Sequence, residues 1–346
     1  QSAFKNIIIN GDMSVAQRAT SVTGITGAGY NTIDRYRLGG SVPGTWTQSQ
    51  ATDVPTGQGF AKSLKMDCTT SASQSSGDTM YIQSKYEGQN LQYLKKGTSS
   101  AESTTLSFWV KTNKTGTYIA TLKDNDNNRT ISKAYTVSSA NTWEKKTLTF
   151  AGDTSGALGN DNGASLELWF WLSAGSDNSS GTLNTSWNSV TNANNAVGQV
   201  NLADSTSNEW YVTGIQLEAG TSASDFEYLP VDVNLQRCQR YFYMHGEGNG
   251  AELGIGGYYN SSQIFLDFQF PVSMRTSPSL YQVSGTNFFL ALRNGASDFL
   301  DDFAIGNVTV NIFSFYNNSD VSGTGGDAAF FRCSNSSAKI GADAEI

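Results

Sequence analysis

Residues 165–172 read Ser-Leu-Glu-Leu-Trp-Phe-Trp-Leu, a stretch in which apolar residues recur at every second position. Successive side chains of a β-strand point to opposite faces of a sheet, so the three leucines and Phe170 share one face, which we expect to lie in a core. The opposite face then carries Glu167, Trp169 and Trp171. The stretch therefore predicts a β-strand whose second face is rich in aromatic side chains.

The same alternation occurs in other stretches before residue 220, at 104–111, 117–123, 143–150 and 209–218. In the first of these stretches, Trp109 lies opposite the apolar face. Polar, turn-forming residues at 113–116 and 124–128 predict two hairpins. Many short strands without helical stretches between them favour an antiparallel β-sandwich.

The composition supports an all-β chain, and its 346 residues exceed the usual size of one domain. Charged residues are 15% and aromatic residues 12%, and polarity comes from Ser, Thr, Asn and Gly, a balance that favours sheets and turns over helices. The net charge is −8 and Lys and Arg cluster only in pairs, which argues against a nucleic-acid partner. No apolar run approaches the roughly 18 residues that cross a bilayer, so membrane insertion is not expected.

The three cysteines, Cys68, Cys238 and Cys333, are odd in number and lack CxxC spacing. This arrangement argues against a disulfide framework and against a zinc site, and we expect three free thiols. No stretch combines the basic start, apolar run and small-residue cleavage site of a signal peptide, so export by that route is not expected.

A helical pattern covers residues 231–242, where apolar residues recur at three- and four-residue steps and Asp232 is placed to cap the helix. Strand patterns resume after it, at 263–270, 279–283, 287–292, 308–315 and 328–333. We therefore expect two domains, residues 1–229 and residues 230–346, with the short helix at their junction.

Four phrases of the chain carry a family resemblance. They are Lys-Asn-Ile-Ile-Ile-Asn-Gly-Asp-Met-Ser-Val-Ala-Gln-Arg at residues 5–18, Asp34-Arg-Tyr36, Cys238-Gln-Arg-Tyr241 and Phe270-Pro-Val-Ser-Met-Arg275. Together they resemble bacteriophage virion fibre and minor structural proteins, in the family's order. The chain departs from the family's usual Gly, Trp and Pro at Ala19, Tyr36 and Asp225.

Three further stretches, 106–111, 143–150 and 212–227, resemble carbohydrate-binding jelly rolls of families four and nine. Both resemblances together imply a carbohydrate-binding-module-like jelly-roll β-sandwich in residues 1–229, followed by a second, smaller β-sandwich in residues 230–346. Fold-level analogy of this kind yields expectations about function, which the site must then support.

The resemblance implies a structural protein of the virion, assembled in the host cytoplasm, that binds other virion proteins and forms a homotrimer. The function it favours is a non-enzymatic tail-fibre or receptor-binding adhesin that contacts host cell-surface polysaccharide. A head fibre or capsid decoration protein is one alternative, and a polysaccharide depolymerase is another.

Residues with catalytic or metal-binding chemistry have plainer structural interpretations. His245 is the single histidine and no serine-nucleophile motif lies near it, so no catalytic triad is expected. Asp301 and Asp302 fit a solvated turn better than a glycosidase pair. Residues 124–128 begin like a calcium loop, but Arg129 stands where an EF-hand needs glycine. We expect no metal and no cofactor, and leave open the structural calcium that the resembled jelly rolls often hold.

The candidate glycan-binding residues are four tryptophans and one glutamate, namely Trp109, Glu167, Trp169, Trp171 and Trp187. A flat aromatic surface beside hydrogen-bonding groups suits the apolar C–H face and hydroxyl rim of a sugar. The same side chains fit two other interpretations. One is a subunit interface, and the other is cover by residues 173–208, a polar stretch that we expect to be a long loop.

Overall fold

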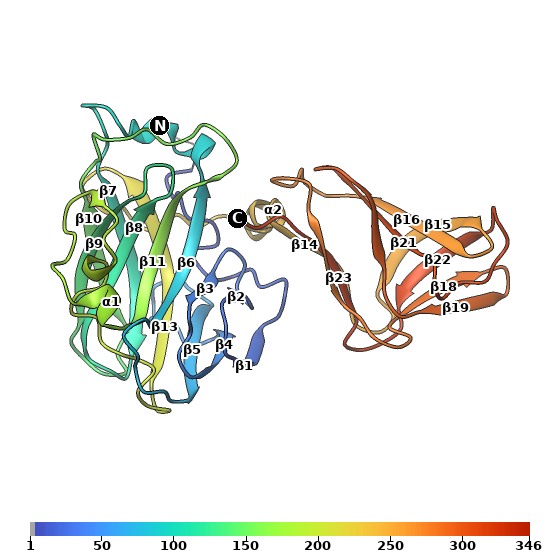
Figure 1. Cartoon of the computed structure of the whole chain (residues 1–346), viewed down its shortest axis with the longest axis horizontal. Helices are drawn as coiled ribbons and strands as arrows, with labels where there is room; N and C mark the ends of the chain where they lie inside the picture. The colour runs from blue at the N-terminus through green and yellow to red at the C-terminus, as the bar shows by residue number, and fades with distance from the viewer. Residues whose placement is uncertain (1–3) are drawn as a thin grey trace. The chain divides into compact units, whose positions relative to one another are not determined.

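The structure, a computed structural model, describes residues 4–346, and strands dominate it (Figure 1). The chain forms two compact units, one made of the residues up to Asn234 together with Ile346, and the other of Leu235–Glu345. Every strand pairing between the described residues is antiparallel, so the predicted all-β class is confirmed.

The first unit is a jelly-roll-type sandwich of two sheets. The six-stranded sheet has the order β1 (Ser21–Ile25), β4 (Thr45–Ala51), β5 (Ser63–Thr70), β13 (Glu209–Ala219), β7 (Thr104–Thr112) and β10 (Glu144–Phe150). The seven-stranded sheet has the order β12 (Asn188–Ser189), β9 (Arg129–Val137), β8 (Gly116–Asp124), β11 (Ala164–Ala174), β6 (Thr79–Glu87), β3 (Arg37–Gly40) and β2 (Gly29–Tyr30).

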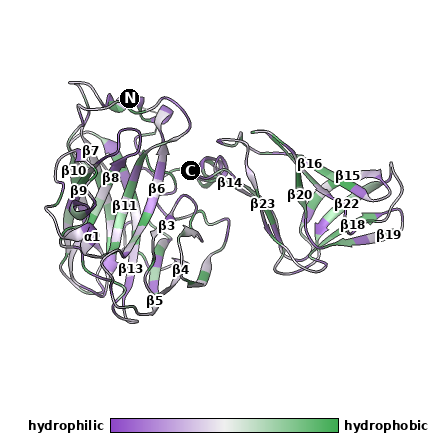
Figure 2. Ribbon diagram, in the orientation of Figure 1, coloured by the Kyte–Doolittle hydropathy of each residue, from purple (hydrophilic) through white to green (hydrophobic). Residues whose placement is uncertain are grey.

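The core of the first unit lies between the inner faces of these sheets. Phe108 of β7 meets Phe170 of β11 edge to face, with ring centroids 4.9 Å apart, and Trp210 of β13 lies 6.0 Å from Phe170. Hydrophobic residues alternate with polar ones along the strands, as Figure 2 shows for β11 and its neighbours. The predicted core face of residues 165–172 is therefore correct.

One predicted hairpin is confirmed and the other is wrong. Asp124 pairs with Arg129 at the tip of the β8–β9 hairpin, as expected for residues 124–128. Residues 113–116, in contrast, join β7 of one sheet to β8 of the other. The apolar faces of β7 and β8 contribute to the same core from opposite sides, so the chain must cross the sandwich there.

Residues 175–208 form the long connection that the composition predicts. It contains α1 (Ser176–Ser179), β12 at the sheet edge and the 3₁₀-turn η3 (Asn192–Asn194). Two other short 3₁₀-turns, η1 (Gly88–Asn90) and η2 (Gln92–Leu94), follow β6.

The second unit begins within the helix α2 (Val231–Gln239) and is a smaller sandwich. Asp232 lies in the first turn of α2 and not at the N-cap, because the helix already begins at Val231. One sheet has the order β14 (Phe242–Glu247), β23 (Lys339–Asp343) and β17 (Ser279–Val283). The other has the order β19 (Ala296–Leu300), β18 (Phe289–Arg293), β22 (Ala328–Cys333), β15 (Glu252–Asn260), β16 (Gln263–Gln269), β21 (Ile312–Asn317) and β20 (Ala304–Val308).

Phenylalanine dominates the core of the second unit. The rings of Phe313 and Phe315 lie 4.6 Å apart, and Phe303 bridges from Phe315 to Phe289. All three cysteines are buried and unbridged, which confirms the predicted free thiols, and burial raises the pKa of Cys333 to about 11. Within residues 4–346, no helix is long and apolar enough to cross a bilayer.

Candidate functional site

The structure distributes the five candidate residues over three places. Glu167, Trp169 and Trp171 lie together on the outer face of the seven-stranded sheet, on β11. Trp109 lies on the outer face of the six-stranded sheet, and Trp187 belongs to the 175–208 connection. No single surface therefore unites all of them.

Trp169 and Trp171 point away from the main core, as the alternation predicts, and of the interpretations open for them the structure shows cover by the polar connection. They are 9% and 1% exposed and form a second small core with Ile119, Ala174 and Ala196. Leu183 of the 175–208 connection packs against this core. Two tryptophans left in water would forgo a large hydrophobic gain, and this connection covers them.

The polar atoms around this pair are also engaged within the fold. Trp171 Nε1 donates to Thr121 Oγ1 at 3.0 Å, and Trp169 Nε1 donates to Glu167 Oε2 at 2.6 Å. The other Glu167 oxygen accepts from Asn125 Nδ2 at 2.7 Å. Glu167 therefore serves as a buried acceptor that holds Trp169.

The ring of Trp169 is occupied as well. Tyr81 stacks on it with centroids 4.4 Å apart and an interplanar angle of 10°. The Nζ atom of Lys123 lies 5.3 Å from the same ring. A sugar would have to displace these neighbours to stack on Trp169, so this part of β11 is structural.

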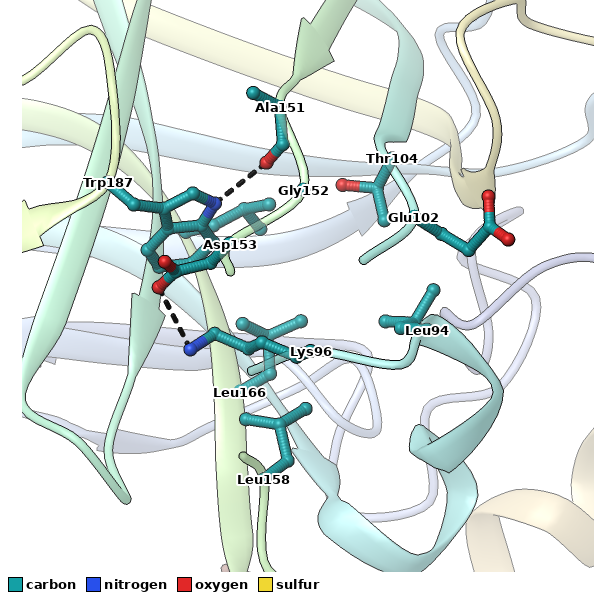
Figure 3. Close-up of a pocket in the computed structure, with 11 residues that line it drawn as sticks. Leu94, Lys96, Glu102, Thr104, Ala151, Gly152, Asp153, Leu158, Leu166 and Trp187 are labelled. Carbon is teal, nitrogen blue, oxygen red and sulfur yellow. Dashed lines mark hydrogen bonds and ion pairs between the residues drawn. The ribbon is translucent and has the colours of Figure 1, made fainter. Parts of the chain in front are cut away.

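Trp187 covers a small niche at the edge of the first unit's core (Figure 3). Its Nε1 atom donates to the Ala151 carbonyl oxygen at 2.8 Å, and Lys96 Nζ lies 5.2 Å from its ring. Four leucines contribute to the lining of the niche, which has a volume of about 20 Å³. That volume admits roughly one water molecule and no sugar ring.

Lys96 joins the niche to a buried group of charges. Its Nζ atom lies 3.0 Å from Asp153 Oδ2 and also pairs with Asp124. Arg129 binds the two Asp153 oxygens from Nε at 2.7 Å and from Nη2 at 3.0 Å. Burial alone would raise the pKa of Asp153, but the hydrogen bonds from Arg129 and Lys96 hold it below its ordinary value.

This group explains what the 124–128 segment does in the fold. The Asp124 carboxylate forms an ion pair with Lys96 and accepts a hydrogen bond from the backbone N–H of Asn127, 3.0 Å away. Two carboxylates face two cations, so the buried charges balance. Among residues 4–346, no cluster of three or more side chains suited to a metal ion occurs.

The outer face of the six-stranded sheet carries a different kind of surface. Trp109 of β7 is half-buried and lies directly opposite Thr213 of β13 and Lys145 of β10. Trp143, two residues before Lys145 and directly before β10, is also half-buried, and continuing the β10–β7 register by one residue puts it diagonal to Trp109. Diagonal cross-strand neighbours are roughly 7–8 Å apart, within reach of each other's side chains.

Beside the tryptophans runs a cross-strand row in which Lys65 of β5 faces Tyr211 of β13, and Tyr211 faces Lys111 of β7. Lys111 Nζ lies 4.5 Å from the Tyr211 ring and 5.8 Å from the Trp143 ring. Asp53 pairs with Lys111 and accepts from Trp143 Nε1 at 2.9 Å. We refer to Trp109, Trp143, Tyr211, Lys65 and Lys111 as the outer-face cluster.

Burial and hydrogen bonds shift the pKa values of Tyr211, Asp53 and Lys65. Burial and the hydrogen bond to Glu209 raise the pKa of Tyr211 to about 12. Burial would raise the pKa of Asp53, yet hydrogen bonds from Lys111 and Trp143 lower it. Lys65 Nζ lies 2.6 Å from Glu209 Oε1 and is held protonated.

Sequence reasoning found only Trp109 of this cluster. Trp143 lies just before its strand, and Tyr211 and Lys65 lie far away in the sequence. The signal that could have found them is the pairing of β10, β7, β13 and β5, because only that order puts these side chains in one row.

An open hollow of about 500 Å³ lies in the 175–208 connection and is lined by amide and hydroxyl side chains with Leu183. Its amides are oriented by the fold. Asn184 Nδ2 donates to Thr130 Oγ1 at 3.2 Å, and Asn194 Oδ1 accepts from the Thr182 N–H at 2.9 Å. The hollow lacks an aromatic ring, which a sugar platform would need.

The residues weighed for catalysis have structural contacts in the second unit. The His245 ring stacks on Phe268 with centroids 3.8 Å apart, and its Nε2 atom lies 2.6 Å from the Leu253 carbonyl oxygen. Burial lowers the pKa of His245. Asp301 follows β19 and accepts from the Asn287 N–H at 2.8 Å, as expected for a turn.

Fold and surface together define a two-unit β-sandwich protein with a fixed aromatic and charged face. No protein-family model matches the chain, and no curated protein sequence matches it. The enzymatically active domain of tailspike protein 4 of bacteriophage CBA120 is 13% identical, with a TM-score of 0.33 over 62% of this chain and 21% of that chain.

Two carbohydrate-binding modules give similar values. TmCBM61, solved with β-1,4-galactotriose, is 7% identical, with a TM-score of 0.33 over 62% of this chain and 99% of that module. The CBM22-1 xylan-binding domain of Xyn10C from Paenibacillus barcinonensis is 12% identical, with a TM-score of 0.29 over 64% of this chain and 100% of that domain. The match thus spans about a fifth of the tailspike chain and nearly all of both modules.

Proposed function

We propose that the chain is a non-enzymatic adhesin of a phage virion, a tail-fibre or receptor-binding protein that binds host cell-surface polysaccharide. The observation that carries the proposal is the outer-face cluster, with its two half-buried tryptophans, one on β7 and one directly before the neighbouring strand β10. The resemblance of the sequence phrases to virion proteins supports the virion setting and the homotrimer.

The cluster has the chemistry that a polysaccharide needs. Indole rings offer flat apolar surface to the C–H face of a sugar, and the neighbouring charged groups can reach its hydroxyls. Trp109 forms no hydrogen bond through Nε1 to any other residue of the 4–346 range, so this N–H is available as a donor. The fixed ion pairs around Tyr211 keep the surface preorganised.

Weak single sites suffice for such an adhesin. Several copies on one particle convert each later contact into an intramolecular step, so avidity exceeds the affinity of one site. The proposed homotrimer would place three outer-face clusters on one assembly.

An array of bacterial capsular polysaccharides and lipopolysaccharides tests the proposal. The intact chain should bind a subset of them, and the pair of substitutions Trp109→Ala and Trp143→Ala should weaken that binding by about 1–3 kcal/mol for each lost stacking contact, a range taken from bases stacking on aromatic side chains. Tyr93→Ala removes an exposed aromatic side chain outside the cluster and serves as the matched control.

Thermal unfolding of each variant separates lost binding from lost folding. Undiminished binding by the double variant would show that the cluster is not the site. Release of reducing sugar from a bound polysaccharide would contradict the non-enzymatic function and favour a depolymerase.

A further inference from the structure

The second unit leaves large apolar side chains in water on one side of its seven-stranded sheet. Phe299 of β19, Phe330 of β22, and Ile255 and Tyr259 of β15 are 49%, 56%, 63% and 74% exposed. These strands lie in the same sheet, where β15, β22 and β18 are neighbours (Figure 1).

The pairing register places these four side chains on the outer face. Ile255 lies directly opposite Phe330, whereas the flanking residues Ala329 and Phe331 point into the core. Phe299 is opposite Leu290, whose neighbours Phe289 and Ala291 are core residues. The exposed residues are therefore the systematic second face of the sheet and not isolated surface positions.

An aromatic row extends this face across the next strands. Tyr259 meets Phe265 of β16 edge to face, with centroids 6.1 Å apart. Phe265 in turn lies 5.7 Å from Tyr316 of β21. We refer to the six residues of this surface as the outer apolar face: Phe299, Phe330, Ile255, Tyr259, Phe265 and Tyr316.

The size of the outer apolar face fits a protein partner. At roughly 200 Å² for a fully exposed large side chain, its four most exposed residues leave on the order of 450–500 Å² in water. That is near the upper end of the largest patch on a typical monomer, and more than half of the roughly 800 Å² that each partner contributes to a stable interface. Half-buried Phe265 and Tyr316 add to it.

The outer apolar face has both raised and low positions, so the same face of a second chain can pack against it. Between the pair Ile255–Phe330 and the ring of Tyr259, the paired residues Gly257 and Ala328 carry no side chain beyond a methyl group. This position is lower than its neighbours, so a ridge of a second, identical face can pack into it.

The charges on the face are self-complementary as well. Glu252 of β15 and Arg332 of β22 are cross-strand partners, and within residues 4–346 they form no ion pair with each other. In a closed symmetric assembly the residue i of one copy meets residue j of the next, so Arg332 of one chain can meet Glu252 of another. The centre of the face, at Ile255 and Phe330, is uncharged.

We propose that the outer apolar face of the second unit binds a second copy of this chain and is the interface through which the protein self-associates. A glycan is a poorer occupant because Phe299, Phe330 and Ile255 offer no hydrogen-bonding group to sugar hydroxyls. The proposal is independent of glycan binding, because it concerns the other unit and a different set of side chains.

Analytical ultracentrifugation of the full chain, from nanomolar to micromolar concentration, tests the proposal. The parent chain should assemble, and the pair Ile255→Thr and Phe330→Thr should weaken its association at least tenfold. Threonine is β-branched and therefore suits a strand at both positions. Val283→Thr, at an exposed apolar position of the smaller sheet, is the matched control and should assemble like the parent.

A charge exchange supplies the second measurement. Arg332→Glu and Glu252→Arg should each weaken association, and the two together should restore it. Near-ultraviolet circular dichroism of every variant checks that the second unit remains folded.

A parent chain that stays monomeric at micromolar concentration would overturn the proposal, as would a double variant that assembles as tightly as the parent. Flotation of a monomeric parent chain with phosphatidylcholine vesicles would reassign the face to a membrane and would overturn the proposal too.

Discussion

Replacing Trp171 by alanine should strongly destabilise the first unit, although its place on the strand suggests a solvent-facing platform. Trp171 is 1% exposed and packs edge to face against Tyr81 and Trp169, with centroids 5.1 and 5.7 Å away. Truncating a fully buried tryptophan costs about 3–5 kcal/mol, because transfer energy is lost and a cavity is left behind.

The lost hydrogen bond adds little to that cost. Trp171 Nε1 donates to Thr121 Oγ1, but this hydroxyl also lies 2.8 Å from Ser132 Oγ and keeps that partner. Trp171→Phe, which preserves most of the ring, should therefore cost only about 1–2 kcal/mol, from a smaller packing loss and one hydrogen bond.

Differential scanning calorimetry of the intact chain gives the measurement. For a unit of this size, each kcal/mol shifts the Tm by roughly 2–4 °C, so Trp171→Ala should lower the transition of the first unit by roughly 6–20 °C. Trp109→Ala, at a half-buried position without a hydrogen bond through its indole nitrogen, is the control and should shift it far less.

A Tm for Trp171→Ala within a degree or two of the parent would refute this reasoning. It would mean that residues 175–208 do not cover β11 in solution, and the sugar-binding interpretation of the pair would regain support.

Two further predictions concern the first unit. The fold holds the pKa of Asp153 below its ordinary value of about 3.9. The contribution of this carboxylate to stability should therefore be complete above that pH and be lost as the pH falls through the native pKa. Asp153→Asn should flatten this acid dependence and cost about 3–5 kcal/mol of stability at pH 7, as measured by Tm against pH. A fragment of residues 1–229 should fold alone, and a fragment of residues 1–234 should have a higher melting temperature. The reason is that Asn234 Oδ1 accepts from the Asn10 N–H at 3.2 Å and its Nδ2 donates to Ser14 Oγ at 2.9 Å. Equal melting temperatures of the two fragments would contradict that role for Asn234.

Local alternation in the sequence was enough to predict most strands after residue 100, including β17 and β22 at their full bounds. Side-chain direction in a strand is set by the backbone, so the core face of β11 followed directly from the positions of its leucines. The free thiols followed from number and spacing. The first strands, β1 to β6, were not predicted, although β5, in which Leu64, Met66 and Cys68 alternate with Lys65 and Asp67, carries the same signal as the later strands.

Contacts between residues far apart in the sequence decided which candidate site residues are accessible. Whether the outward tryptophans of β11 meet water or protein is decided by where residues 175–208 lie, and a polar connection without periodicity carries no signal of its path. The outer-face cluster likewise exists only because β10, β7, β13 and β5 are neighbours in that order.

The sequence by itself thus determined the class of the fold, the faces of the strands and the chemistry available on each, because these follow from backbone geometry and residue type within a few positions. The tertiary structure decided which of those faces are covered, and which aromatic side chains come together or remain in water. The reason is that strand order and the cover over each face depend on the free energy of packing segments that are far apart in the chain.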